Sequence, residues 1–114
     1  MSGTNEGAPP EKRQSARRRT LLRGKLVHSA GSFTQDCAIR NLSETGAQVR
    51  VTNAQSIPDK MQLIDITNAM LYEAEIVWRR APEFGLRFLA GCPAQEAPPR
   101  LYYLRQLWLE CSRR

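Results

Sequence analysis

The chain has little of the chemistry that enzymes and metal sites use. It contains a single histidine, His28, and three widely spaced cysteines, Cys37, Cys92 and Cys111, among 114 residues. An odd number of cysteines at such spacing gives neither a disulfide framework nor a zinc-binding pattern. No Ser/His/Asp set, acidic metal cage or Gly-rich phosphate loop is present. We therefore expect no enzymatic activity, no metal and no bound cofactor.

Long apolar runs are also missing. Residues 1–10 are polar, so they do not form a signal peptide, and no segment approaches the length of a membrane helix. We therefore expect a cytoplasmic protein without membrane insertion. Residues 1–16 are rich in Gly, Pro, Ser and charge, which predicts a flexible tail. The rest, residues 17–114, suits one domain.

Positive charge is abundant and concentrated. The net charge is +6, and seven of the 17 Lys and Arg residues lie between Lys12 and Lys25. Such a cluster favours an anionic partner, namely a nucleotide, a nucleic acid or a membrane surface. The alternative is an ordinary solvated basic surface.

Apolar and polar residues alternate with a period of two along most of the chain, which predicts strands. The predicted strands span residues 25–28, 33–40, 47–51, 61–66, 72–79 and 85–89. Short strands separated by frequent turns are typical of a small barrel or sandwich. Closing the sheet into a barrel would remove exposed strand edges.

The C-terminal segment changes to helical spacing. Leu101, Leu104, Leu107, Trp108 and Cys111 recur three and four residues apart, which predicts an amphipathic helix over 99–112. A linker over 92–99 leads into it. We expect the helix to cover one open end of the barrel.

Two short segments could bind a ligand. In the first, Arg19 and Arg23 stand four residues apart just before the first predicted strand, with Arg18 beside them. A guanidinium group can bind a phosphate through two hydrogen bonds, match the acceptors of guanine or stack on a base. The alternative is a basic arm for nucleic acid or lipid.

The second segment, residues 41–46, joins two predicted strands. Asn41 offers a donor and an acceptor, and Ser43 offers a hydroxyl for a phosphate. Gly46 can adopt a positive φ and lets backbone approach a ligand closely. The alternative is an ordinary polar turn.

Together, in this order and spacing, the two segments resemble the signature of the PilZ domain family. Arg19-Thr-Leu-Leu-Arg23 matches the family's Arg-x-x-x-Arg element, and Asn41-Leu-Ser-Glu-Thr-Gly46 matches its Asp/Asn-x-Ser-x-x-Gly element. Residues 74–80 and 84–88 look like the family's last two strands. The resemblance implies a mainly β fold, a six-stranded antiparallel β-barrel with a C-terminal α-helix, over residues 17–114. It also implies that the ligand is cyclic di-GMP, a bacterial second messenger.

The resemblance assigns ligand contacts to six residues. The arginines grip guanine and phosphate, the asparagine reads a guanine edge, the serine contacts phosphate and the glycine gives backbone access. These residues are Arg18, Arg19, Arg23, Asn41, Ser43 and Gly46. Trp78 and Arg80 align with a strand position that some members use to line the base. The alternative for Trp78 is an aromatic residue of the barrel core.

The function that the resemblance implies is a binding switch. Cyclic di-GMP would order the arginine-rich leader against the barrel and alter a surface that a partner protein reads in trans, because no output domain lies on this chain. Motility, polysaccharide export and biofilm control are all outputs compatible with the family. One alternative is a small basic barrel that binds nucleic acid, which the lack of an outward row of aromatics disfavours. The other is a PilZ-like protein–protein adaptor without nucleotide.

Overall fold

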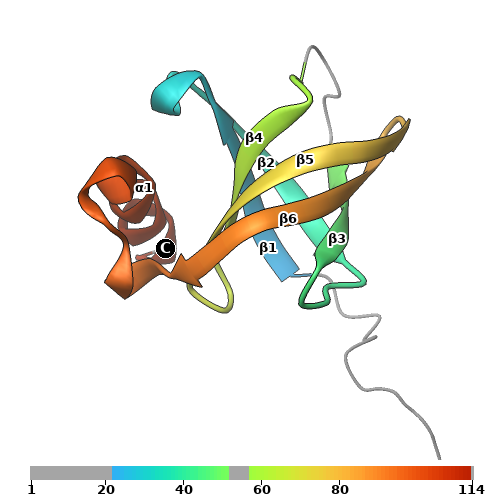
Figure 1. The fold of residues 1–114 in the computed structure, drawn as a ribbon. Coiled ribbons are helices and arrows are strands. Elements are labelled where there is room, and N and C mark those ends of the chain that lie inside the picture. The colour runs from blue at the N-terminus through green and yellow to red at the C-terminus, as the bar shows by residue number, and fades with distance from the viewer. Residues whose placement is uncertain (1–21, 52–56, 114) are drawn as a thin grey trace, which may run out of the picture.

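The computed structural model describes residues 22–51 and 57–113, so the predicted tail, residues 1–16, lies outside it. In this part of the chain, six antiparallel strands close into a barrel in the order β1-β2-β3-β6-β5-β4 (Figure 1). The strands are β1 Leu22–His28, β2 Phe33–Arg40, β3 Gly46–Val51, β4 Lys60–Asp65, β5 Met70–Arg80 and β6 Glu83–Pro93. The predicted fold class is confirmed.

Three single-turn 3-10 helices and one α-helix complete the described fold. The 3-10 helices are η1 Ser29–Gly31, η2 Ala94–Glu96 and η3 Pro99–Leu101, and the α-helix is α1 Tyr102–Ser112. The segment predicted as a linker, residues 92–99, thus contains the end of β6, all of η2 and the start of η3. The predicted helix over 99–112 begins as a 3-10 turn and becomes α-helical at Tyr102.

The period-two pattern determines which side chains fill the barrel. On β3, Ala47, Val49 and Val51 are buried, whereas Gln48 and Arg50 point outward. The interior is filled by buried side chains from all six strands and from the segment before β4. These are Leu26, Ile39, Ala47, Val49, Val51, Ile57, Met61, Leu63, Ala74, Phe84 and Leu86.

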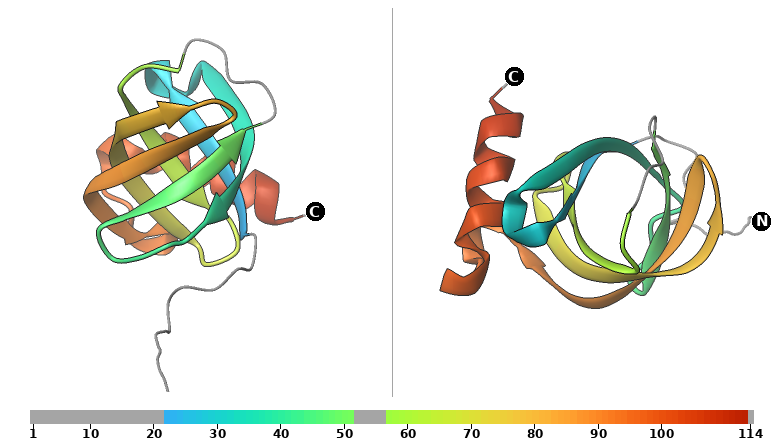
Figure 2. Two further views of the ribbon diagram at one scale, coloured as in Figure 1. Left: turned by 90° about the vertical axis from the view of Figure 1, so that its right-hand side faces the viewer. Right: turned by 90° about the horizontal axis from the view of Figure 1, so that it is seen from above.

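The position of α1 differs from the prediction. The helix packs against the outer wall of the barrel rather than over an open end (Figure 2). Val27 and Ile64, which follow the interior residues Leu26 and Leu63, point outward and pack with Leu104 of the helix in a second core. A strand covered on both faces reads as a nearly continuous apolar run, which explains the run over residues 61–66.

Two register shifts interrupt the pairing of β5 with β6. They lie between Glu73 and Ala74 and between Ile76 and Trp78. A β-bulge inserts one unpaired residue and so reverses the facing of the residues that follow it. Because Val77 is the extra residue of the second shift, Trp78 faces outward, opposite to the side that simple alternation predicts.

Candidate ligand-binding site

Arg23 is the residue of the arginine leader that lies within the described residues, whereas Arg18 and Arg19 lie outside them. It is exposed and belongs to β1, paired with Ala38 of β2. The prediction that the first strand starts at residue 25 is therefore wrong. The alternation was hidden by Gly24, whose interior position is filled by the side chain of Ile39.

The backbone of Arg23 is bound to a second element as well. Its carbonyl oxygen accepts from the backbone N–H of Ile66 at 3.0 Å, and its own N–H donates to Oγ1 of Thr67 at 3.2 Å. Ile66 and Thr67 belong to the turn between β4 and β5. The buried carboxylate of Asp65 closes this turn by accepting from the backbone N–H and the Nδ2 of Asn68. The backbone of Arg23 is therefore held in place by these hydrogen bonds, while the residue remains exposed.

The turn between β2 and β3 is organised around Ser43. Its Oγ accepts from the backbone N–H groups of Thr45 and Gly46, both at 3.3 Å, and its backbone N–H donates to the Gly46 carbonyl at 2.9 Å. Asn41 enters the turn with φ 50°, a left-handed conformation that asparagine tolerates well. Ser43 therefore holds the turn, and contact with a phosphate requires its hydroxyl proton to leave the Gly46 carbonyl at 3.2 Å.

The structure changes the role of Gly46. Gly46 does not adopt the positive φ that glycine permits, because Gly31 is the only glycine with positive φ among the described residues. Gly46 is buried on β3, and a Cβ there would overlap the carbonyl oxygen of Leu86 on β6. Glycine is needed here because two backbones approach closely, and the ligand contact at Gly46 stays a prediction.

Strand register brings the two predicted segments to the same end of the barrel. Leu22 pairs with Ile39, one residue before Arg40 ends β2 and the turn begins at Asn41. The start of β1 and the β2–β3 turn accordingly lie near each other, on the side of the barrel away from α1 (Figure 1). The arginine and the polar turn can face one ligand although they are far apart in sequence.

A polar network continues from the turn across the outer wall. Nδ2 of Asn41 donates to Oε1 of Gln48 at 2.7 Å, and Nε2 of Gln48 donates to Oε1 of Glu83 at 2.8 Å. Oε2 of Glu83 accepts from Arg40 at 3.2 Å and from Arg50 at 3.5 Å. Sequence reasoning missed Gln48, the direct partner of Asn41, and the three residues beyond it in the network. The period-two pattern could have shown that these side chains face outward. It could not show which of them meet, because that depends on how the strands pair.

Trp78 and Arg80 are both exposed on β5, and the alternative of Trp78 as a barrel-core residue is wrong. The indole is 42% exposed and lies over Gly85, where a Cβ would overlap its ring. Arg80 pairs in register with Glu83. The outer wall of β5 and β6 therefore presents an aromatic face and a cation beside the polar network.

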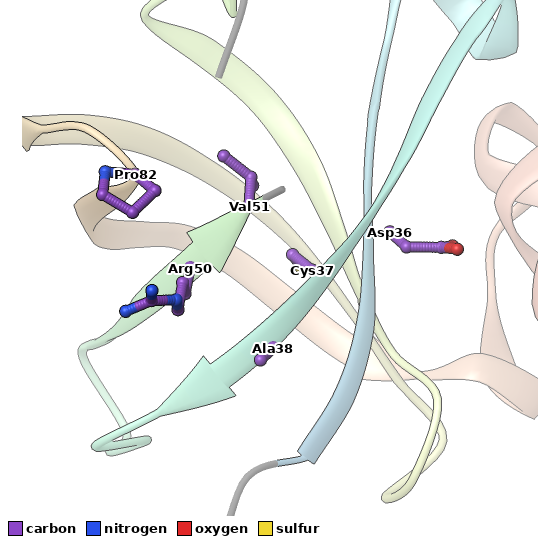
Figure 3. A pocket seen from close by; sticks show the side chains of 6 residues that line it. All are labelled: Asp36, Cys37, Ala38, Arg50, Val51 and Pro82. Atoms are coloured by element: carbon purple, nitrogen blue, oxygen red, sulfur yellow. The ribbon is translucent and has the colours of Figure 1, made fainter. Parts of the chain in front are cut away.

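A hollow of about 530 Å³ adjoins this wall between β2, β3 and the β5–β6 turn (Figure 3). Its lining residues are Asp36, Cys37, Ala38, Arg50, Val51 and Pro82. The Asp36 carboxylate points away from Arg50 and accepts from Nζ of Lys25 at 2.7 Å. Arg50 is thus the cation at the hollow, and it also touches the network through Glu83.

Comparison with known families supports the signature found in the sequence. The PilZ domain model matches residues 11–98, most of the chain. The chain belongs to the PilZ family. This is a family of cyclic di-GMP receptors, which are binding domains rather than enzymes. No curated protein matches the chain at a significant level.

The family match covers both motifs and the whole barrel of this PilZ domain but ends before α1. No group of three or more potential metal-ligating side chains occurs in the part of the chain that the structure describes. Of the helices in residues 22–51 and 57–113, none has the length and apolarity that crossing a membrane requires.

Cys37 lines the hollow of this PilZ domain, and its thiol is expected to be inert. Burial, with a smaller effect from the charge of Asp36, raises its pKa to about 12. Because the thiolate is the nucleophile, we expect alkylation near pH 8 to be at least roughly a hundredfold slower in the folded than in the unfolded protein. Stability should also fall as pH rises from 9.0 toward 12, because the unfolded chain releases this proton first.

Peptide mapping by mass spectrometry after timed labelling measures the rate at each cysteine separately. The same protein unfolded in guanidinium chloride gives the reference rate for Cys37. Equal rates in the two states would show that the thiol is open to reagent, and the raised pKa would then be wrong.

Proposed function

We propose that this PilZ domain is a cyclic di-GMP receptor whose site lies on the outer wall of the barrel. The ligand contacts are Arg18, Arg19 and Arg23 of the leader and Asn41 and Ser43 of the β2–β3 turn, with Gly46 shaping the turn. The observation that carries the proposal is the register of β1 with β2, because it puts Arg23 and the turn at one end of the barrel.

The chemistry of the wall suits a ligand with two phosphates and two guanines. Arg23 is exposed and can offer its planar guanidinium to a phosphate or to the acceptors of guanine. Asn41 is exposed at the same end of the barrel and offers polar atoms to a base edge. Trp78 adds an exposed ring on which a base can stack, with Arg80 as a further cation.

The anchoring of Arg23 restricts the switch to the residues before Leu22. The backbone of Arg23 is bonded to β2 and to the β4–β5 turn, so Arg23 belongs to the barrel rather than to the segment that precedes it. In our proposal the ligand first meets Arg23 and the turn, and Arg18 and Arg19 then close over it. Neutralising their mutual repulsion favours this closure.

The closed leader and the changed charge around it would form a surface that a partner protein reads in trans. We propose that this happens in the bacterial cytoplasm, with motility or biofilm regulation as the output. A nucleic-acid function is less well supported. The exposed aromatics of the described residues, Phe33, Trp78 and Tyr102, lie on three different elements and form no row for stacking successive bases.

Calorimetric titration with cyclic di-GMP tests the proposal. We expect saturable binding by the wild type and a loss of at least roughly a hundredfold in affinity for Arg19→Ala/Arg23→Ala, because each charged hydrogen bond contributes about 1.5–3 kcal/mol. The matched control is Arg105→Ala/Arg113→Ala, which removes the same charge from the helix and its end. The control should change affinity less than about threefold, because charges beyond a Debye length are screened.

Two results would overturn the proposed function. The first is no heat of binding with the wild type, and the second is the same affinity in the double variant of the leader and the wild type. The stoichiometry of the titration also reports whether one nucleotide or a stacked pair is bound.

A further inference from the structure

In the polar network beside the β2–β3 turn, Glu83 determines which group donates and which accepts in each hydrogen bond. Glu83 presents a carboxylate whose Oε2 accepts from Arg40 and Arg50. An ionised carboxylate only accepts hydrogen bonds. Gln48 must therefore face Glu83 with its NH₂ group, which it does at 2.8 Å.

This orientation decides which atom Gln48 offers at its other end. With Nε2 committed to Glu83, Oε1 of Gln48 faces Asn41 and can only accept. Asn41 must then donate through Nδ2, as it does at 2.7 Å. The Asn41 side chain is exposed, and in the described residues no group donates to its Oδ1. The amide of Asn41 thus offers an acceptor to the surface.

We propose that Gln48 and Glu83 are positioning residues that make Asn41 a guanine-specific acceptor. This inference rests on the proposed function. The Watson–Crick edge of guanine carries adjacent donors at N1 and N2, whereas adenine carries one donor at N6 beside an acceptor at N1. An outward Oδ1 can therefore accept two hydrogen bonds from guanine but one from adenine, and a reversed amide would donate to the adenine N1 acceptor. The network orients an amide to act as a carboxylate would at the same position.

The two matched variants of Gln48 differ in what they can offer to Asn41. Gln48→Lys can still pair with Glu83, but lysine only donates, so Asn41 must turn Oδ1 inward. Gln48→Glu accepts from Nδ2 and leaves Oδ1 facing outward. The two substitutions also change the overall affinity through charge. The added lysine attracts an anionic ligand, whereas the added glutamate repels it.

The test compares cyclic di-GMP with cyclic di-AMP by calorimetry. We expect the wild type and Gln48→Glu to keep the same ratio of the two affinities, although Gln48→Glu binds both ligands more weakly. In Gln48→Lys the ratio should fall roughly tenfold or more, the discrimination that one well-formed base contact provides. A gain in affinity for both ligands with an unchanged ratio would show that charge alone acts at this position.

An unchanged ratio in Gln48→Lys, or an equal fall in both variants, overturns the inference and leaves the proposed function standing. A wild type that binds neither nucleotide overturns the proposed function instead. The network itself is also testable without ligand. In NMR spectra one Nδ2 proton of Asn41 should be shifted by its hydrogen bond in the wild type and in Gln48→Glu, and should lose that shift in Gln48→Lys. The same shift in all three proteins would contradict the fixed direction.

Discussion

Gly46→Ala is expected to destabilise the domain by about 3 kcal/mol or more, enough to unfold much of a small protein. The added Cβ would lie well inside 3.0 Å of the Leu86 carbonyl oxygen, with the Leu86 carbonyl carbon at 3.2 Å and Cα of Arg87 at 3.4 Å. All three are backbone atoms. Relief requires β3 to separate from β6, which breaks the ladder between Ala47 and Leu86.

Urea unfolding followed by circular dichroism measures this cost. The matched control is Gly91→Ala on β6, where the nearest atom is a ring carbon of Tyr72 at 2.8 Å. A side-chain ring can turn away, so we expect the control to lose less than about 1 kcal/mol. Comparable losses in the two variants would refute the backbone explanation for Gly46.

This result would also change how binding data on the motif are interpreted. If Gly46→Ala lowers affinity for cyclic di-GMP, the loss reports a distorted β3–β6 pair rather than a missing ligand contact. Arg23 and Asn41, whose side chains are exposed, are the positions at which a substitution reports on the ligand more directly.

Much of the fold could be predicted because each strand has one face in the barrel interior. The alternation of Val49 and Val51 with Arg50 is a local property, and it identified a strand without knowledge of its neighbours. The predicted position of the helix was wrong because it depends on contacts between elements that are distant in sequence. The outward apolar residue Ile64 belongs to the contact with α1, so the helix covers the wall rather than an end.

Trp78 shows a second kind of limit. Counting by two from Ala74 and Ile76 puts the tryptophan inside the barrel, but the register shift after Ile76 turns it outward. A single extra residue reverses the facing of everything beyond it, and nothing in the local sequence distinguishes Val77 from an ordinary strand residue.

The candidate site, like the fold, has one part that the sequence predicted and one part that it did not. The spacing of Arg23 and of Asn41 to Gly46 was visible in the sequence because motif residues follow one another along the chain. The network that orients Asn41 was not visible in the sequence. Gln48 and Glu83 are 35 residues apart and meet because β3 pairs with β6, and only the direction of their hydrogen bonds reveals what Asn41 offers.

The second large effect is expected at the opposite wall, where Leu104→Ala should cost about 2–5 kcal/mol. Leu104 is fully buried and packs in the cluster that joins α1 to the barrel, with Val27 and Ile64 among its members. Truncation leaves a cavity that neither the helix nor the closed sheet can readily fill. The matched control is Leu109→Ala on the same helix, a partly buried residue outside that cluster, with an expected loss under about 1 kcal/mol.

Urea midpoints of the two variants give the stability difference, and cyclic di-GMP titration under native conditions gives its functional consequence. Because α1 lies on the wall away from the β2–β3 turn, Leu104→Ala should remain close to wild type in affinity while losing stability (Figure 2). Equal stability of the two leucine variants would mean that α1 is not held by this cluster. A selective loss of affinity in Leu104→Ala without loss of fold would mean that the helix is coupled to the site, which would place the readout of ligand binding at the helix rather than at the leader.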